Sequence, residues 1–193
     1  MDVDEPRPTG EEIAALARRI DRPVVLVGMM GTGKTSVGRK LAHALGLPFV
    51  DADEAIEEAA HMSIAEIFGT YGEDYFRDGE RRVIARLMER QPGQPPRVIA
   101  TGGGAFVNPQ TRALILANAI TVWLDSDIET LFERIGRSDK RPLLRQGDPR
   151  DILTRLRTER EPYYAEAPIH ITSGPGPQAR TLAKVLKGID EWL

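Results

Sequence analysis

The chain has no cysteine among its 193 residues, which excludes disulfides, thiolate metal sites and cysteine nucleophiles. It also lacks any apolar run near the roughly 20 residues that span a bilayer. No excess of positive charge is present, because the net charge is −3, and a broad basic surface for nucleic acid is thereby excluded. We therefore expect no membrane and no nucleic-acid partner, and a monomer.

The overall composition is that of an ordinary globular protein, with 41% hydrophobic and 28% charged residues. The acidic start, Met1–Glu5, resembles neither a signal peptide nor a transit peptide, so a cytoplasmic location is expected. We predict that residues 1–22 form a partly disordered N-terminal extension and that residues 23–193 form a single domain.

Residues 28–35, Gly-Met-Met-Gly-Thr-Gly-Lys-Thr, match the phosphate-binding loop pattern G-x-x-x-x-G-K-[ST] at every fixed position. The glycines let backbone N–H groups point at phosphate oxygens, and the N-terminus of a following helix adds partial positive charge. Lys34 is expected to reach the β- and γ-phosphates, and the Thr35 hydroxyl to bind Mg²⁺. The alternative, a glycine-rich turn that happens to precede a helix, is disfavoured by the flanking strand and helix patterns.

Strand and helix patterns alternate along the chain. We predict strands near 24–28, 47–50, 97–101, 120–124 and 168–172, and helices near 34–45, 53–60, 63–71, 74–90, 109–117, 127–135, 149–160 and 177–192. A further helix over 9–20 is expected to lie outside the main fold. Alternation of this kind predicts an α/β protein in which helices cover both faces of a parallel sheet. Ligands bind beyond the carboxyl ends of such strands, where residues 28–35, 51–53 and 101–104 fall.

Two carboxylates, Asp51 and Asp53, follow the second predicted strand. One could support Mg²⁺, often through water, and the other could orient or deprotonate an attacking hydroxyl. Asp53 could instead be the N-cap of the next helix, and for an isolated D-x-D that interpretation would be favoured. A neighbouring phosphate loop favours the functional interpretation, although one residue can serve both purposes.

Two arginines admit a structural and a functional interpretation. Arg77 and Glu80 are three residues apart on one helix face, and this spacing alone favours a solvated ion pair. In the functional interpretation, Glu80 holds Arg77 toward a substrate carboxylate. Arg160, at the end of the helix predicted over 149–160, could simply complement the helix dipole.

Two further segments are equally ambiguous. The turn Gly102-Gly103-Gly104 suits either a ligand that approaches the main chain closely or a loose connection. The segment 134–145 contains Arg134, Arg137, Lys140, Arg141 and Arg145. It suits either a lid that folds over phosphates or a solvated loop.

Taken together, these segments resemble the shikimate kinase family over about residues 23–190. The matching segments are Gly28–Thr35 with 37–42, Phe49–Asp53, Ser63–Phe68, Phe76–Glu80, Gly102–Ala105, Arg141–Leu144 and Arg160–Tyr164. The phosphate loop alone is shared by many NTPases. The combination of D-x-D, F-R-x-x-E, G-G-G and R-P-L-L is far more specific.

The resemblance implies a fold like that of nucleoside monophosphate kinases. This is a three-layer α/β/α arrangement with a five-stranded parallel sheet in the order 2-3-1-4-5, a lid at about 136–148 and a substrate-binding helical segment. It also implies transfer of the ATP γ-phosphoryl group to the 3-hydroxyl of shikimate in aromatic amino-acid biosynthesis, with Mg²⁺ as cofactor.

The resemblance further implies a role for each matching residue. The ATP phosphates would be bound by Gly31, Thr32, Gly33, Lys34, Thr35, Ser36 and Arg141, Mg²⁺ by Thr35 and Asp51, the adenine side by Arg134, and shikimate by Asp53, Arg77, Gly102, Gly103, Gly104 and Arg160. The residues expected to act in catalysis are Lys34, Asp53 and Arg141.

Two other functions stay open. One is phosphorylation of another small acceptor, such as gluconate or a nucleoside monophosphate, although paired arginines favour a carboxylate over a base. The other is a non-catalytic switch that binds ATP and would not need Asp53, Arg77 and Arg160 together.

Overall fold

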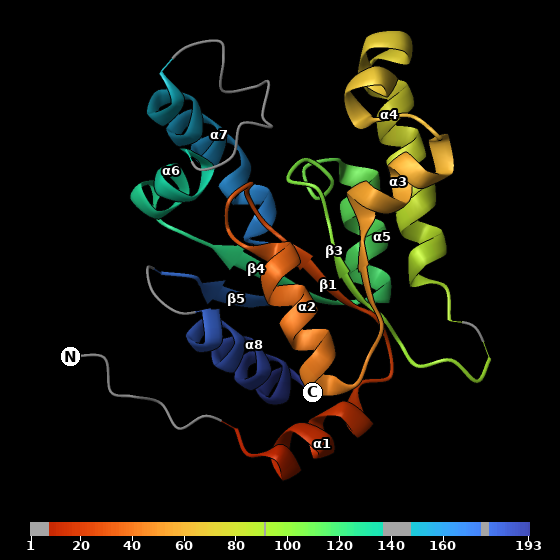
Figure 1. The fold of residues 1–193 in the computed structure, drawn as a ribbon, viewed down its shortest axis with the longest axis vertical. Coiled ribbons are helices and arrows are strands. Elements are labelled where there is room, and N and C mark those ends of the chain that lie inside the picture. Colours follow the sequence, from red (N-terminus) through yellow and green to blue (C-terminus); the bar gives the residue numbers. More distant parts are fainter. Residues whose placement is uncertain (1–7, 91, 137–147, 175–177) are drawn as a thin grey trace.

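The computed structural model describes residues 8–90, 92–136, 148–174 and 178–193, which form a parallel sheet between two layers of helices (Figure 1). The strands are β1 (Val24–Val27), β2 (Phe49–Asp51), β3 (Val98–Ala100), β4 (Ile120–Asp125) and β5 (Ile169–Thr172). They follow the order β2-β3-β1-β4-β5, which confirms the predicted fold class and strand order. In these described ranges, no helix has the length and hydropathy needed to cross a membrane.

Eight helices connect or flank the strands in the described residues. They are α1 (Gly10–Arg19), α2 (Lys34–Leu45), α3 (Ala52–Ala60), α4 (Ile64–Met88), α5 (Pro109–Asn118), α6 (Ile128–Gly136), α7 (Pro149–Tyr164) and α8 (Gln178–Trp192). All strand pairings are parallel, so the carboxyl ends of the strands meet at one edge of the sheet.

The central strand β1 divides the hydrophobic core into two halves. Successive strand residues point to opposite faces. Val24 and Leu26 accordingly pack into a cluster with residues of α1, α2 and α8, whereas Val25 and Val27 pack with residues of α4, α5, α6 and α7. All four residues of β1 are fully buried, as expected for a strand covered on both faces. Figure 1 shows α2 and α8 side by side on one face.

The helix α1 is part of the packed structure. Thr9 caps it in a capping box with Glu12, Leu16 joins the core cluster beneath α2 and α8, and Arg19 pairs with Asp190 at 2.5 Å. The expectation that this helix lies outside the main fold was wrong, because burial of its apolar face depends on tertiary contacts that the spacing does not reveal. The domain boundary at residue 23 stays a prediction.

Two helices differ in extent from the sequence prediction. The predicted helices 63–71 and 74–90 form one element, α4, that is kinked at Gly72 (φ 82°, ψ 177°), a conformation essentially restricted to glycine. Helix α7 continues to Tyr164 instead of ending at residue 160. Pro162 has no N–H to donate within the helix, but the next turn still closes, because Ala165 N donates to the Glu161 carbonyl at 2.9 Å.

Two helical glycines give a matched stability test. A Cβ at Gly38 in α2 would lie 2.7 Å from a ring carbon of Phe49 in β2, whereas a Cβ at Gly79 in α4 would meet nothing within 4 Å. Gly79→Ala should therefore raise the free energy of unfolding by about 0.5–1 kcal/mol. Gly38→Ala should lower it by about 1 kcal/mol or more, because overpacking outweighs the helix propensity. Urea denaturation measures both, and equal stabilisation by the two variants would contradict this packing.

Candidate active site

The phosphate loop joins β1 to α2 and has the conformation that its motif predicts. Gly28, Gly31 and Gly33 have positive φ, and a Cβ at Gly28 would collide with the Leu124 carbonyl of β4. Lys34 is buried, and its Nζ donates to the carbonyls of Gly28 and Met29, both at 2.8 Å. The ammonium group therefore lies inside the curl of the loop, at the N-terminus of α2.

The Thr35 hydroxyl donates to Asp51 Oδ2 at 2.7 Å, so these two oxygen ligands lie together beside the loop. Hydroxyl and carboxylate oxygens suit Mg²⁺, which usually takes one or two protein ligands and completes its shell with phosphates and water. Among the described residues, no cluster of three or more acidic, His or Cys side chains could hold a metal.

Asp51 is also the N-cap of α3, because its Oδ1 accepts from Asp53 N at 3.0 Å. The alternative that made Asp53 the cap was wrong, since the helix begins one residue earlier than predicted. The capping role therefore falls to Asp51, and the Asp53 carboxylate faces the glycine turn that follows β3.

The turn Gly102-Gly103-Gly104 lies against three functional groups. A Cβ at Gly102 would be 2.6 Å from Asp53 Oδ1, a Cβ at Gly103 would be 3.4 Å from Met30 N of the phosphate loop, and a Cβ at Gly104 would collide with the Arg77 guanidinium. Thr101 anchors the turn through bonds from its N and Oγ1 to the Leu26 carbonyl. The three glycines thus permit close approach of the protein's own groups, and the approach of a ligand to this main chain stays a prediction.

Arg77 on α4 is held by a buried carboxylate. Its Nη1 donates to Glu80 Oε2 at 2.7 Å, and Glu80 is only 1% exposed. The solvated ion pair favoured by the sequence was therefore wrong, because Glu80 faces the protein interior. Burial raises the pKa of Glu80 above its usual value, and the neighbouring Arg77 charge opposes that rise.

Arg160 reaches the same turn from the opposite side. It lies within α7, four residues before the end, so its interpretation as a helix-terminal charge was wrong. Its Nη1 lies 3.4 Å from the Gly103 carbonyl, which also accepts a bond from the Tyr164 hydroxyl. Burial raises the pKa of Tyr164 to about 12, so the hydroxyl stays protonated as a donor.

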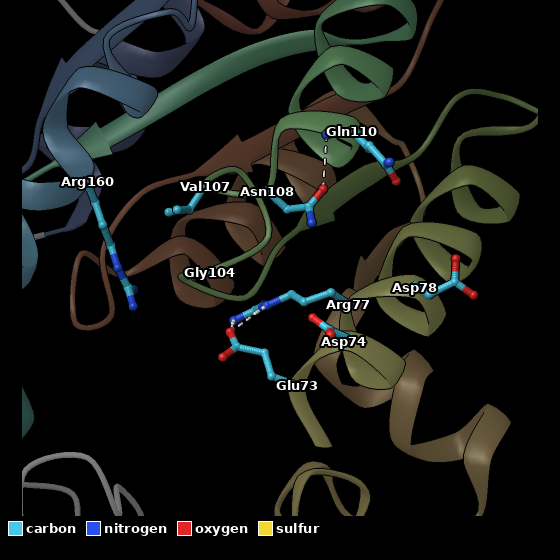
Figure 2. A pocket seen from close by; sticks show the side chains of 9 residues that line it. All are labelled: Glu73, Asp74, Arg77, Asp78, Gly104, Val107, Asn108, Gln110 and Arg160. Carbon is cyan, nitrogen blue, oxygen red and sulfur yellow. Dashed lines mark hydrogen bonds and ion pairs between the residues drawn. The ribbon is translucent and has the colours of Figure 1, made fainter. Parts of the chain in front are cut away.

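Arg77 and Arg160 both line one cleft of about 370 Å³ beside Gly104 (Figure 2). Figure 2 shows their side chains entering it from two separate helices, α4 and α7. Two guanidinium groups in one small cleft suit a ligand with a carboxylate or phosphate group.

Asp53 lies near the charges of Lys34 and Arg77 and is largely buried. Burial raises the pKa of its carboxyl, the charge of Asp51 raises it further, and the positive charges of Lys34 and Arg77 lower it in part. The result is a carboxyl with a raised pKa between the phosphate loop and the arginine-lined cleft, which is the position a proton-accepting group would need.

Arg134 on α6 joins the phosphate loop to the segment after β5. Its Nη1 lies 3.3 Å from the Thr32 carbonyl and 3.2 Å from Ser173 Oγ, and its Nη2 donates to the Gly174 carbonyl at 2.9 Å. The serines of this network, Ser126 and Ser173, were missed at the sequence level. Each directly follows a strand, so the rule that placed Asp51 at the sheet edge could have found them. Arg141 and residues 137–147 of the predicted lid, which was placed at about 136–148, lie outside the described residues.

The comparisons with known proteins agree with this geometry. The shikimate kinase family model matches residues 30–190. A shikimate kinase from Novosphingobium aromaticivorans is 63% identical over 193 residues, which is all of both chains.

The structure is also similar to that of a shikimate kinase from Acinetobacter baumannii in complex with shikimate. The TM-score is 0.82 at 34% identity, and the match covers 95% of this chain and 98% of the other. A gluconokinase from Sinorhizobium meliloti gives a TM-score of 0.60 at 18% identity, over 90% of this chain and 94% of the other, and therefore shares the fold alone. With its phosphate loop, glycine turn and paired arginines, this chain belongs to the shikimate kinase family.

Proposed function

We propose that this protein transfers the γ-phosphoryl group of ATP to the 3-hydroxyl of shikimate, a step of aromatic amino-acid biosynthesis. The observation that carries the proposal is the glycine turn at residues 102–104, which brings Asp53, Arg77 and Arg160 together beside the phosphate loop. A switch that only binds ATP has no use for two guanidinium groups and a buried carboxyl at that place.

On the nucleotide side, Lys34 and the loop amides of residues 31–36 bind the β- and γ-phosphates at the N-terminus of α2. Thr35 and Asp51 hold Mg²⁺, which when bound offsets negative charge on the phosphates. Arg134 flanks the adenine side through its contacts to Thr32 and Gly174. Arg141, from its place in the R-P-L-L segment, adds positive charge at the transferred group.

On the acceptor side, Arg77 and Arg160 bind the shikimate carboxylate, and the Gly103 backbone lies beside it. This places the ring so that a hydroxyl reaches Asp53. Asp53 orients the hydroxyl and accepts its proton as the bond to phosphorus forms, a task that its raised pKa suits. Most of the acceleration then comes from positioning and from neutralisation of charge.

The proposal that the protein has no nucleic-acid or membrane partner comes from its composition. The net charge of −3 supports a protein that binds neither nucleic acid nor a membrane surface. A monomeric state and a cytoplasmic location stay predictions.

An ADP-release assay separates the candidate functions. With ATP and Mg²⁺, shikimate should stimulate ADP release, whereas gluconate and nucleoside monophosphates should leave the rate at its background value. Stimulation by gluconate instead of shikimate would replace the proposed acceptor. ADP release that is independent of every acceptor would favour the switch.

The two-arginine site predicts a large change in acceptor affinity. Arg160→Ala should raise the KM for shikimate about tenfold or more, because a charge-assisted hydrogen bond is worth about 1.5–3 kcal/mol. Arg155→Ala is the matched control, since Arg155 lies on the same helix, is 68% exposed and only approaches Glu159 at 3.9 Å. Steady-state kinetics should leave this control near the wild-type KM. An equal KM for shikimate in both variants would show that Arg160 does not bind the acceptor.

Asp53→Asn should lower kcat by about 100-fold or more, since proton transfer by a positioned side chain contributes about that much. The same change should raise the melting temperature at pH 7. When the pKa of a carboxyl is higher in the folded protein than in the unfolded chain, the folded protein becomes less stable as the pH rises from the unfolded pKa through the folded pKa. Ionised Asp53 therefore lowers the stability of the folded protein at neutral pH, and this effect is absent in acid below the ordinary aspartate pKa.

Thermal melting from about pH 4 to pH 8 measures this effect, because the ordinary aspartate pKa is about 3.9. The melting temperature of the Asp53→Asn variant should exceed that of the wild type at the upper end, and the difference should shrink toward the lower end. A wild type that is the more stable protein at neutral pH would show that ionised Asp53 is stabilised by its surroundings.

A further inference from the structure

Arg77 contacts a second carboxylate besides Glu80. Its Nε and Nη2 donate to Glu73 Oε1 at 3.3 Å and 3.4 Å, and Figure 2 shows this contact inside the arginine-lined cleft. Arg160, by contrast, forms no ion pair with any described residue, and its guanidinium lies against the Gly103 carbonyl and the Tyr164 hydroxyl. The two arginines of the proposed acceptor site therefore differ, because Arg77 pairs with two carboxylates and Arg160 pairs with none among the described residues.

The two carboxylates on Arg77 are of different kinds. Glu80 is buried and binds at 2.7 Å, whereas the Glu73 side chain is 66% exposed and its two contacts are long. Exposed ion pairs at i,i+4 spacing are weak, and their partners separate readily. Glu80 is thus a permanent support for Arg77, and Glu73 is a partner that Arg77 can release.

Glu73 also occupies a part of Arg77 that a ligand would use. The Nε and Nη2 groups form one edge of the guanidinium plane, and such an edge binds a carboxylate through two parallel hydrogen bonds. The position of Glu73 follows from the kink at Gly72, directly before it, which begins the helical segment that carries both residues. Glu73 therefore places a carboxylate of the protein itself against the Arg77 guanidinium, which is the group that would bind the substrate carboxylate.

We propose that Glu73 competes with the substrate carboxylate for Arg77 and so sets the affinity of the acceptor site. This inference rests on the proposed function, because it takes Arg77 as a ligand of the acceptor. When the acceptor binds, Glu73 turns outward into solvent, and its ion pair with Arg77 is exchanged for one with the ligand. Glu73 weakens binding through this exchange and takes no part in phosphoryl transfer.

The test is Glu73→Gln, which keeps the size of the side chain and removes its charge. An exposed ion pair is worth about 0.2–1 kcal/mol, so the KM for shikimate should fall by a factor of about 1.4 to 5. The kcat should stay within about twofold of the wild type, because Glu73 does not reach the transferred group. Calorimetric titration with shikimate should show the same decrease in Kd.

Asp78→Asn is the matched control. Asp78 lines the same cleft from the same helix, but its carboxylate pairs with Arg81 at 2.7 Å and Arg82 at 3.1 Å and not with Arg77. The KM of the Asp78→Asn variant for shikimate should stay near the wild-type value. Melting curves check that both variants are folded, which is expected for near-isosteric changes at exposed carboxylates.

Three results would overturn the inference. An unchanged or higher KM in the Glu73→Gln variant would mean that Glu73 has no effect on Arg77 or helps to position it. An equal decrease in the Asp78→Asn variant would mean that the general charge of the cleft, and not the contact with Arg77, sets the affinity. Wild-type protein that neither binds nor phosphorylates shikimate would overturn the proposed function and this inference together. The measurement on the wild-type protein alone is enough to recognise that case.

Discussion

The whole site depends on the contact between a turn without side chains and the charged groups around it. Gly102 lies against Asp53, Gly103 against the phosphate loop and Gly104 against Arg77. A methyl group at the first or third of these positions would push a functional side chain away. The parallel sheet makes the contact possible, because it ends β1, β2 and β3 at one edge, where the phosphate loop, the two aspartates and the glycine turn lie.

The charges in this small region are matched to different tasks. Lys34 is enclosed by backbone carbonyls, Arg77 is supported by buried Glu80, and Arg160 is presented by α7 with Tyr164 bonded to the same carbonyl beside it. Asp53 has a raised pKa because burial and Asp51 act in the same direction. A site of this kind has positive charge in place for an anionic substrate and a carboxyl that can take up a proton.

Much of the fold could be predicted from the sequence, and the site could be predicted in part. Strand and helix periodicity located the ends of every strand to within two residues, and the phosphate motif identified Lys34 and Thr35. Properties that depend on tertiary packing could not be predicted. Spacing shows that Arg77 and Glu80 share a helix face, but only the fold shows that this face is buried. The length of α7 past Pro162 and the competing contact of Glu73 depend on neighbours that no local pattern names.

A crystal structure of the protein with bound shikimate tests the central claim most directly. The account predicts the shikimate carboxylate within hydrogen-bond distance of both Arg77 and Arg160, and the 3-hydroxyl at the Asp53 carboxylate on the side of the phosphate loop. Shikimate bound in another cleft, or bound with its carboxylate toward Asp53, would contradict the account.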